Sequence, residues 1–290
     1  MAAHRVGRLS SVIAPDFAPS GIPDSLIHTV AGTNNIASRF KIPYRIRVKL
    51  GLDFFLMDNA FDLKARKLVG DADIFHGWSH QALFSMKAAH RRRMKTVVER
   101  PNMHPLEQAR LVNAEYEKYG FGRKSQCPGE LTKTIRELEL ADRVIVCSEL
   151  AKQSHVENGI APDKIRVINY GVDAEVFAPG TRKDDVFRVV YCGMVCLRKG
   201  AQYLLQAWKD LNLPDAELWL IGVVLAGCRE ADGGVSAPAG GEDGGARELP
   251  PRTGGVVSAG KCVCFSIGRG RIWLGGDGGD GLRCAGDRFG

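Results

Sequence analysis

The sequence lacks any run of the roughly 18–20 apolar residues that a membrane-spanning helix needs. Its first eight residues include a histidine and two arginines, and no apolar segment follows them, so we expect no secretory signal. Of the eight cysteines, Cys147 and Cys192 lie inside apolar strand patterns, where reduced buried thiols are common. These features favour a cytoplasmic protein over a disulfide-linked one.

The formal net charge is +7, and the basic residues are scattered along the chain with a single short run. A positive balance favours acidic partners such as nucleotide phosphates, anionic lipid or nucleic acid. The only basic run, Arg91-Arg92-Arg93, is interpreted as a solvated helix end, with a lipid-facing patch as the alternative. We expect a cytoplasmic chain that has no nucleic-acid partner. Peripheral contact with an anionic membrane is left open.

One stretch, residues 191–208, combines a strand end, a glycine turn and a helix. An apolar run ends just before Gly193, and helical spacing of apolar residues begins at Gly200. Backbone N–H groups and the positive end of the helix dipole then face the carboxyl edge of the strand, beside Arg198 and Lys199. The pattern predicts an anion site, and the alternative is the basic first turn of an ordinary surface helix.

Upstream of this stretch, strand and helix patterns alternate, which predicts α/β architecture with parallel sheets and right-handed crossovers. Residues 1–70 are less regular, with elements suggested at 12–13, 26–30 and about 50–63. Ligands bind such sheets at the carboxyl ends of the strands. We expect strands at 73–78, 95–100, 143–148 and 165–170, and helices at 79–92, 105–119, 129–140 and 149–158. The resulting cleft candidates are His76, Gly77, Glu99, Arg100, Ser148, Asn169 and Gly171.

Four pieces of sequence follow one another in a distinctive order between residues 141 and 222. They are ADRVIVCS from Ala141, KIRVINYGVDAEVFAP from Lys164, GMVCLRKGAQYLLQA from Gly193 and AELWLIG from Ala216. In this order they resemble the retaining glycosyltransferases of family 4. The resemblance implies the GT-B architecture, in which two Rossmann-like domains with parallel sheets face each other.

The same resemblance implies a function. A sugar is transferred with retention from a nucleotide-diphosphate sugar to a glycan or lipid-linked acceptor, without a metal or other cofactor. Donor binding falls on Gly193, Arg198, Lys199 and Gly200, with the basic pair stabilising the diphosphate as it leaves. His76 becomes the catalytic candidate, because family members often carry a cleft histidine after an aspartate-apolar-apolar strand.

Several positions keep more than one interpretation. Trp78 stands where a second histidine is common in the family, so His80 is an alternative to the first histidine, and either could be a hydrogen-bonded strand-end residue. Glu99 and Arg100 either shape the acceptor side or are paired charges at a strand exit. Met194 replaces an arginine that the family often has, which leaves the donor charge to the basic pair.

We expect three segments in the chain. Residues 1–170 form an acceptor-side Rossmann-like domain whose opening strand and glycine loop are not found, and residues 171–222 begin an incomplete nucleotide-sugar domain. Residues 223–290 hold 19 of the 34 glycines and four of the eight cysteines. Such composition is typical of a disordered tail, and its cysteine spacing does not match a zinc site.

A shifted reading frame explains the tail better. The family needs a Glu-x7-Glu pair beyond Gly222 to hold the donor, and the chain as written has none. Read one base later from Lys261, permitted codons give NVCVFPSVEEGFGLVVMEAMACGVPVIAS, which contains that pair. The codon formed from Trp273 and Leu274 can then encode only glycine. We expect the frame to slip between about Val223 and Gly240, which would leave an out-of-frame tail and an inactive fragment.

Two other classes of function remain as alternatives. One is a non-catalytic binding fragment, in which the N-terminal domain is a basic docking module and the glycine-rich segment is a linker. The other is a nicotinamide-dependent Rossmann enzyme. That class is disfavoured because no G-x-G-x-x-G follows an early strand with an acidic residue about 20 positions later.

Overall fold

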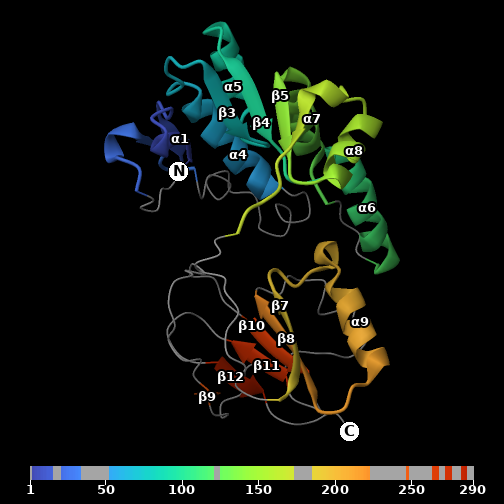
Figure 1. Ribbon diagram of the computed structural model, residues 1–290. Helices are drawn as coiled ribbons and strands as arrows, with labels where there is room; N and C mark the ends of the chain where they lie inside the picture. The colour runs from blue at the N-terminus through green and yellow to red at the C-terminus, as the bar shows by residue number, and fades with distance from the viewer. Residues whose placement is uncertain are drawn as a thin grey trace. The chain divides into compact units, whose positions relative to one another are not determined.

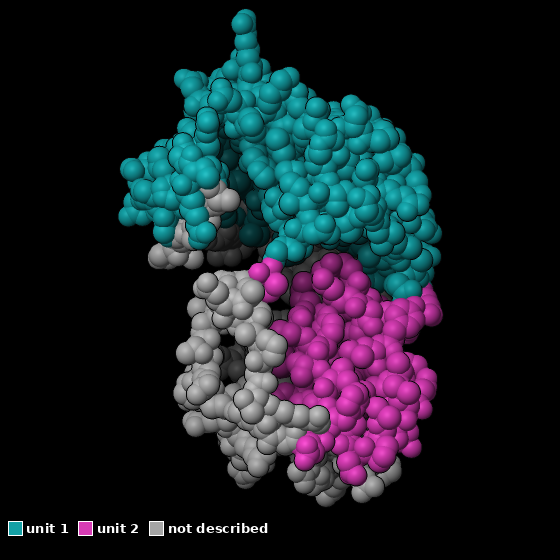
Figure 2. Space-filling model, viewed as in Figure 1, with its two compact units in different colours: residues 1–117, 122–171 teal, residues 118–121, 172–290 magenta. Residues whose placement is uncertain are grey.

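The computed structural model describes residues 2–15, 21–33, 52–120, 125–172 and 185–222, and four short stretches further on, at 246–247, 263–267, 272–275 and 282–285. The chain divides into two compact units (Figure 2). Unit 1 comprises Met1–Glu117 and Gly122–Gly171, and unit 2 comprises Lys118–Phe121 and Val172–Gly290. Both units contain parallel strands and helices, which confirms the predicted α/β class.

Unit 1 is built on a four-stranded parallel sheet in the order β3-β4-β5-β6. The first three strands are each followed by one or two helices, as the alternating sequence pattern predicts. The strands are β3 (Ile74–Trp78), β4 (Lys95–Glu99), β5 (Arg143–Val146) and β6 (Ile165–Val167). The helices after them are α5 (Leu83–Arg91), α6 (Pro105–Lys118), α7 (Pro128–Leu140) and α8 (Glu149–Glu157). Preceding the sheet are α1 (Ala2–Arg5), the parallel pair β1 (Val12–Ala14) and β2 (Ile27–Thr29), and α4 (Leu52–Ala65).

Helices α5, α7 and α8 cover the same face of this sheet (Figure 1). Every second strand residue points into the core they form, because side chains alternate between the two faces of a strand. The core cluster contains Met86, Val98, Leu138, Val144, Val146, Ala151 and Ile165. Residues on the opposite face of the same strands are exposed or half-buried. The two faces of the sheet therefore differ sharply in environment.

Unit 2 contains a smaller parallel pair, β7 (Phe187–Cys192) and β8 (Ala216–Gly222). Helix α9 (Ala201–Leu211) connects them and packs Leu204, Leu205 and Trp208 against Leu218 and Leu220 of β8. The strand β10 (Val263–Ile267) pairs antiparallel with β8. The strands β9 (Ala246–Arg247), β11 (Ile272–Gly275) and β12 (Leu282–Ala285) form a separate antiparallel sheet. These four strands are the described part of the glycine-rich segment.

Helix α5 begins at Leu83, not at Ser79 as the sequence predicts. The carboxylate of Glu137, on α7, accepts hydrogen bonds from the backbone N–H groups of His80 (2.6 Å), Ala82 (2.9 Å) and Leu83 (3.0 Å). His80 has a positive φ of 78°, which a continuous helix does not allow. A distant side chain therefore sets where the helix starts, and the local pattern could not reveal it.

A second buried carboxylate completes the start of α5. Asp62, on α4, accepts hydrogen bonds from the backbone N–H groups of Phe84 and Ser85, each at 2.9 Å. Lys133, on α7, lies with its ammonium group 3.0 Å from Asp62 and balances its charge. Since the first N–H groups of a helix have no partner within it, these two carboxylates supply the partners from neighbouring helices.

Replacing Glu137 by alanine is expected to lower the free energy of unfolding by about 3 kcal/mol or more, because three backbone donors near the core would lose their acceptor. Urea denaturation followed by circular dichroism measures the effect. The control is Glu139→Ala, on the exposed side of the same helix. Equal losses for the two variants would contradict the capping role of Glu137.

Candidate functional site

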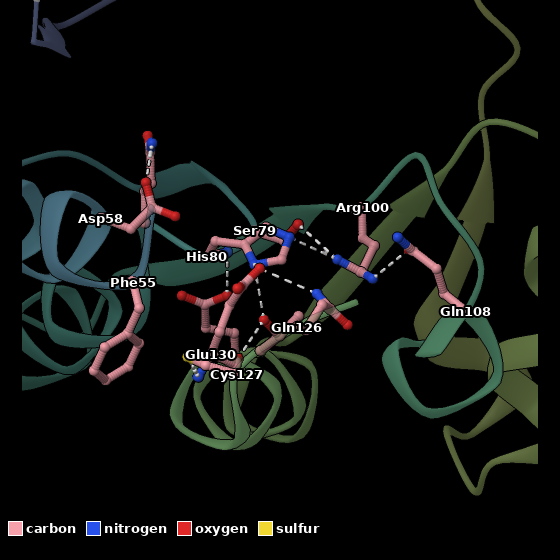
Figure 3. A network of polar contacts seen from close by, with 12 residues as sticks. Phe55, Asp58, Ser79, His80, Arg100, Gln108, Gln126, Cys127 and Glu130 are labelled. Atoms are coloured by element: carbon pink, nitrogen blue, oxygen red, sulfur yellow. Dashed lines mark hydrogen bonds and ion pairs between the residues drawn. The ribbon is translucent and has the colours of Figure 1, made fainter. Parts of the chain in front are cut away.

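The carboxyl ends of β3 and β4 are joined by a buried polar network (Figure 3). Ser79 and His80 follow β3, and Arg100 follows β4. The buried guanidinium group of Arg100 donates to His80 Nε2 (3.0 Å), to Ser79 Oγ (3.4 Å) and to Gln108 Oε1 (3.0 Å). It also donates to the carbonyl of Met103 at 3.1 Å. Arg100 therefore fixes both loops at this edge of the sheet.

The hydrogen bonds of His80 define its protonation state. Arginine can only donate, so His80 Nε2 accepts from Arg100 and carries no proton. The proton must lie on Nδ1, which is 3.1 Å from Thr134 Oγ1 and 3.3 Å from Glu130 Oε1. Burial, together with the charges of Arg100 and Lys133, lowers the pKa of His80 to about 4. His80 is thus neutral, and both of its ring nitrogens have hydrogen-bond partners.

Burial also shifts the acids around His80. It raises the pKa of Glu137 to about 7 and raises the pKa of Glu130, which accepts a hydrogen bond from Gln126 Nε2 at 3.1 Å. The pKa of Arg100 is lowered to about 10 by burial, while both glutamates act in the opposite direction. These groups contact one another within the protein, so they position the loops and are poorly placed to meet a substrate.

His76 and Glu99 lie on the other, open face of the sheet. His76 Nε2 is 3.3 Å from Glu99 Oε2, and the His76 side chain is half-exposed. Trp78 follows on the same face and pairs in register with Glu99. Of the two histidines that the sequence proposes, the structure places His76 toward solvent and His80 inside the unit.

The remaining cleft candidates have local structural contacts. Ser148 Oγ accepts a hydrogen bond from the N–H of Ala151 at 3.1 Å and caps α8. Asn169 Nδ2 donates to the carbonyl of Cys147 at 3.2 Å. Gly171 is exposed. All three follow the carboxyl ends of β5 and β6, where the sequence places them.

In unit 2 the predicted donor residues form one turn between β7 and α9. A 3-10 helix, Leu197–Lys199, precedes Gly200, which adopts the left-handed conformation with φ 75° immediately before α9. The side chains of Arg198 and Lys199 are exposed. Ala201 and Gln202, the first residues of α9, are buried. Any anion at this turn would therefore be held chiefly by the two basic side chains.

A close backbone approach in this turn depends on a glycine that the sequence analysis did not single out. A side chain at Gly222, where φ is 147°, would collide with the carbonyl oxygen of Gly193. At Gly193 itself, a Cβ atom would meet nothing closer than the Tyr191 hydroxyl at 3.7 Å, although its φ of 148° also favours glycine. The N–H of Gly193 donates to the carbonyl of Ile221 at 2.7 Å, which ties the two strand ends together.

The structure adds charged residues that sequence reasoning missed, namely Asp62, Lys133 and Glu137. Each lies on the buried side of a helix. The signal in the sequence would have been a single acid or lysine within a stripe of apolar residues. Among the described residues no group of three His, Cys, Asp or Glu side chains could hold a metal ion. None of the described helices combines the length and apolar character needed to cross a membrane.

His80 is expected to contribute a loss of stability as the pH is lowered from about 6.5 toward 4. The unfolded chain binds a proton at His80 with the ordinary pKa of about 6.5, whereas the folded chain binds it only near pH 4. His80→Gln removes this linkage. Between pH 6.5 and 4, the unfolding free energy of the variant should therefore fall by about 3 kcal/mol less than that of the wild-type chain.

Urea titrations at a series of pH values test this expectation. Glu137, whose pKa shift acts in the opposite direction, is present in both chains and cancels in the comparison. A wild-type slope that persists in His80→Gln would contradict the neutral, buried state of His80.

Comparison with known proteins gives a family, and a solved structure that resembles part of the chain. The model of Glycosyltransferase Family 4 matches residues 27–176, just over half of the chain. The structure of UDP-GlcNAc 2-epimerase from Methanocaldococcus jannaschii aligns with 61% of this chain at 9% identity and a TM-score of 0.33. The match covers 50% of that structure's chain. No curated protein sequence matches the chain.

Proposed function

The chain belongs to glycosyltransferase family 4, and we propose that its two units derive from an enzyme for retaining sugar transfer. The donor is a nucleotide-diphosphate sugar and the acceptor is a glycan or a lipid-linked glycan precursor. The observation that supports this most directly is the turn after β7, where two exposed cationic side chains immediately precede Gly200 and α9. With a lipid-linked acceptor, peripheral contact with an anionic membrane belongs to the same proposal.

The turn suits the chemistry of a leaving diphosphate. Negative charge grows on the phosphate oxygens as the bond to the sugar breaks, and fixed cations near those oxygens stabilise that charge. Arg198 offers a planar fork for phosphate oxygens, and Lys199 offers a compact point charge. Gly193 and Gly222 let the ends of β7 and β8 pack closely together, which fixes the start of the turn that carries both cations.

Nucleotide-sugar binding tests the donor site directly. Lys199→Ala is expected to weaken binding of UDP-glucose or GDP-mannose about tenfold, because one charge-assisted contact to phosphate is lost. Isothermal titration calorimetry on the full chain measures the change. Lys209→Ala, an exposed lysine near the far end of α9, is the matched control. Equal weakening by both variants would indicate a general charge effect and contradict the site.

We further propose that the chain as written is inactive because its reading frame shifts after β8. The family's motif pieces continue to Gly222, the last residue of β8, and the carboxylate pair expected beyond it is absent. The shifted translation from Lys261 restores that pair at a suitable distance. A chain without those carboxylates lacks the groups that the resemblance implies for holding the donor sugar.

The DNA sequence across codons 215–290 from a fresh template decides this point. We expect one inserted or deleted base between about codons 223 and 240, and the corrected gene should encode the E-G-F-G and E-A-M-A-C-G motifs. The corrected protein should then transfer or hydrolyse a nucleotide sugar that the present chain leaves intact. An uninterrupted frame in an independent isolate would overturn the proposal.

A further inference from the structure

The open face of the sheet in unit 1 exposes aromatic side chains at the carboxyl ends of its strands. On β3, Ile74 and Trp78 are 59% and 50% exposed, and His76 lies between them on the same face. Beyond β6, Tyr170 is 64% exposed. Exposed aromatic side chains that gather on one face mark binding surfaces more often than chance.

The centre of this face is polar. Trp78 is the register partner of Glu99, so their side chains lie on the same face of neighbouring strands. His76 Nε2 contacts Glu99 Oε2 at 3.3 Å. Burial is the main cause that raises the pKa of Tyr170, and the nearby charge of Glu99 acts in the same direction. The bond from Asn169 to the Cys147 carbonyl fixes the segment that carries Tyr170.

A covering helix suits this face poorly. A helix laid across it would take the His76–Glu99 pair out of water, and the desolvation of such a pair commonly outweighs its attraction. A sugar ring has a different surface, with an apolar C–H face and a rim of hydroxyl groups. The apolar face matches an aromatic ring that presents its own face or edge, and the hydroxyl groups match a carboxylate and an imidazole that both accept hydrogen bonds.

The width of the face suggests more than one sugar. Trp78 lies on β3, Glu99 on β4 and Cys147 after β5, while Tyr170 follows β6. Three strand spacings separate β3 from β6, which amounts to roughly 14 Å. That span exceeds a single pyranose ring and fits a short oligosaccharide laid across the strands.

We propose that this open face binds the acceptor as an oligosaccharide. Trp78 contacts one sugar ring, Tyr170 contacts another, and the His76–Glu99 pair binds hydroxyl groups between them. Glu99 also positions His76, since an N–H at Nε2 directed to the carboxylate leaves Nδ1 as the ring nitrogen that can accept from a hydroxyl group. The inference rests on the proposed function and adds the class of acceptor and the residues that select it.

Saturation-transfer NMR on the full chain tests the proposal. The probes are linear trisaccharides of glucose, galactose, mannose and N-acetylglucosamine. We expect at least one trisaccharide to bind, with affinity reduced tenfold or more by Trp78→Ala and largely kept by Trp78→Phe. Leu150→Ala removes an equally exposed apolar side chain, on α8, and should have no effect.

Tyr170→Ala should weaken the trisaccharide and leave the matching monosaccharide unchanged. Failure of all four trisaccharides to bind would overturn the proposal, as would equal losses in Trp78→Ala and Leu150→Ala. If Trp78→Ala instead converts a dimer to a monomer in analytical ultracentrifugation while no sugar binds, the face is a self-association surface and the proposal is wrong. Nucleotide-sugar binding at Arg198 and Lys199 is measured separately, so failure here leaves the donor proposal standing.

Discussion

The fold of unit 1 depends on two carboxylates buried at the start of α5. Glu137 and Asp62 come from two different helices, and together they accept hydrogen bonds from backbone N–H groups between His80 and Ser85. Since a helix N-terminus carries partial positive charge, the arrangement satisfies both the donors and the dipole. It also joins α4, α5 and α7 into one block over the sheet.

This arrangement has a consequence for ligand binding. The helix that follows a strand in a parallel sheet often offers its N-terminus to a phosphate group. In unit 1 that position after β3 is filled by the protein's own acids, and an added phosphate would meet two carboxylates. This position is therefore unsuited to a phosphate, whereas Arg198 and Lys199 of unit 2 present exposed positive charge.

The buried network beside α5 follows from the same constraint. Burying Glu137 and Asp62 is tolerable only with compensating positive charge nearby. Lys133 contacts Asp62 directly, and Arg100 contributes charge close to Glu137 and Glu130. Next to these two cations, His80 stays neutral and serves as a hydrogen-bond acceptor for Arg100. The side chain that sequence reasoning offered as an alternative cleft histidine thus belongs to the internal charge balance.

Local pattern predicted the parallel α/β sheet, because strand and helix periodicity are properties of adjacent residues. It could not predict the start of α5, because Glu137 lies 54 to 57 residues from the N–H groups that it caps. It also could not show which of the two histidines, His76 or His80, lies on the open face of the sheet. The alternation of β3 turns His76 to the open face, whereas the positive φ at His80 turns the chain inward.

The two units differ in the charge that they expose near the ends of their strands. The carboxyl end of the open face in unit 1 carries Glu99 beside aromatic side chains, so it repels a diphosphate and suits an uncharged glycan. The turn in unit 2 has the opposite character, with the exposed cations Arg198 and Lys199. A transferase needs both environments, because its acceptor is a neutral hydroxyl group and its leaving group gains negative charge. Under the proposed function, the open face of unit 1 would meet the acceptor and the turn in unit 2 would meet the phosphates.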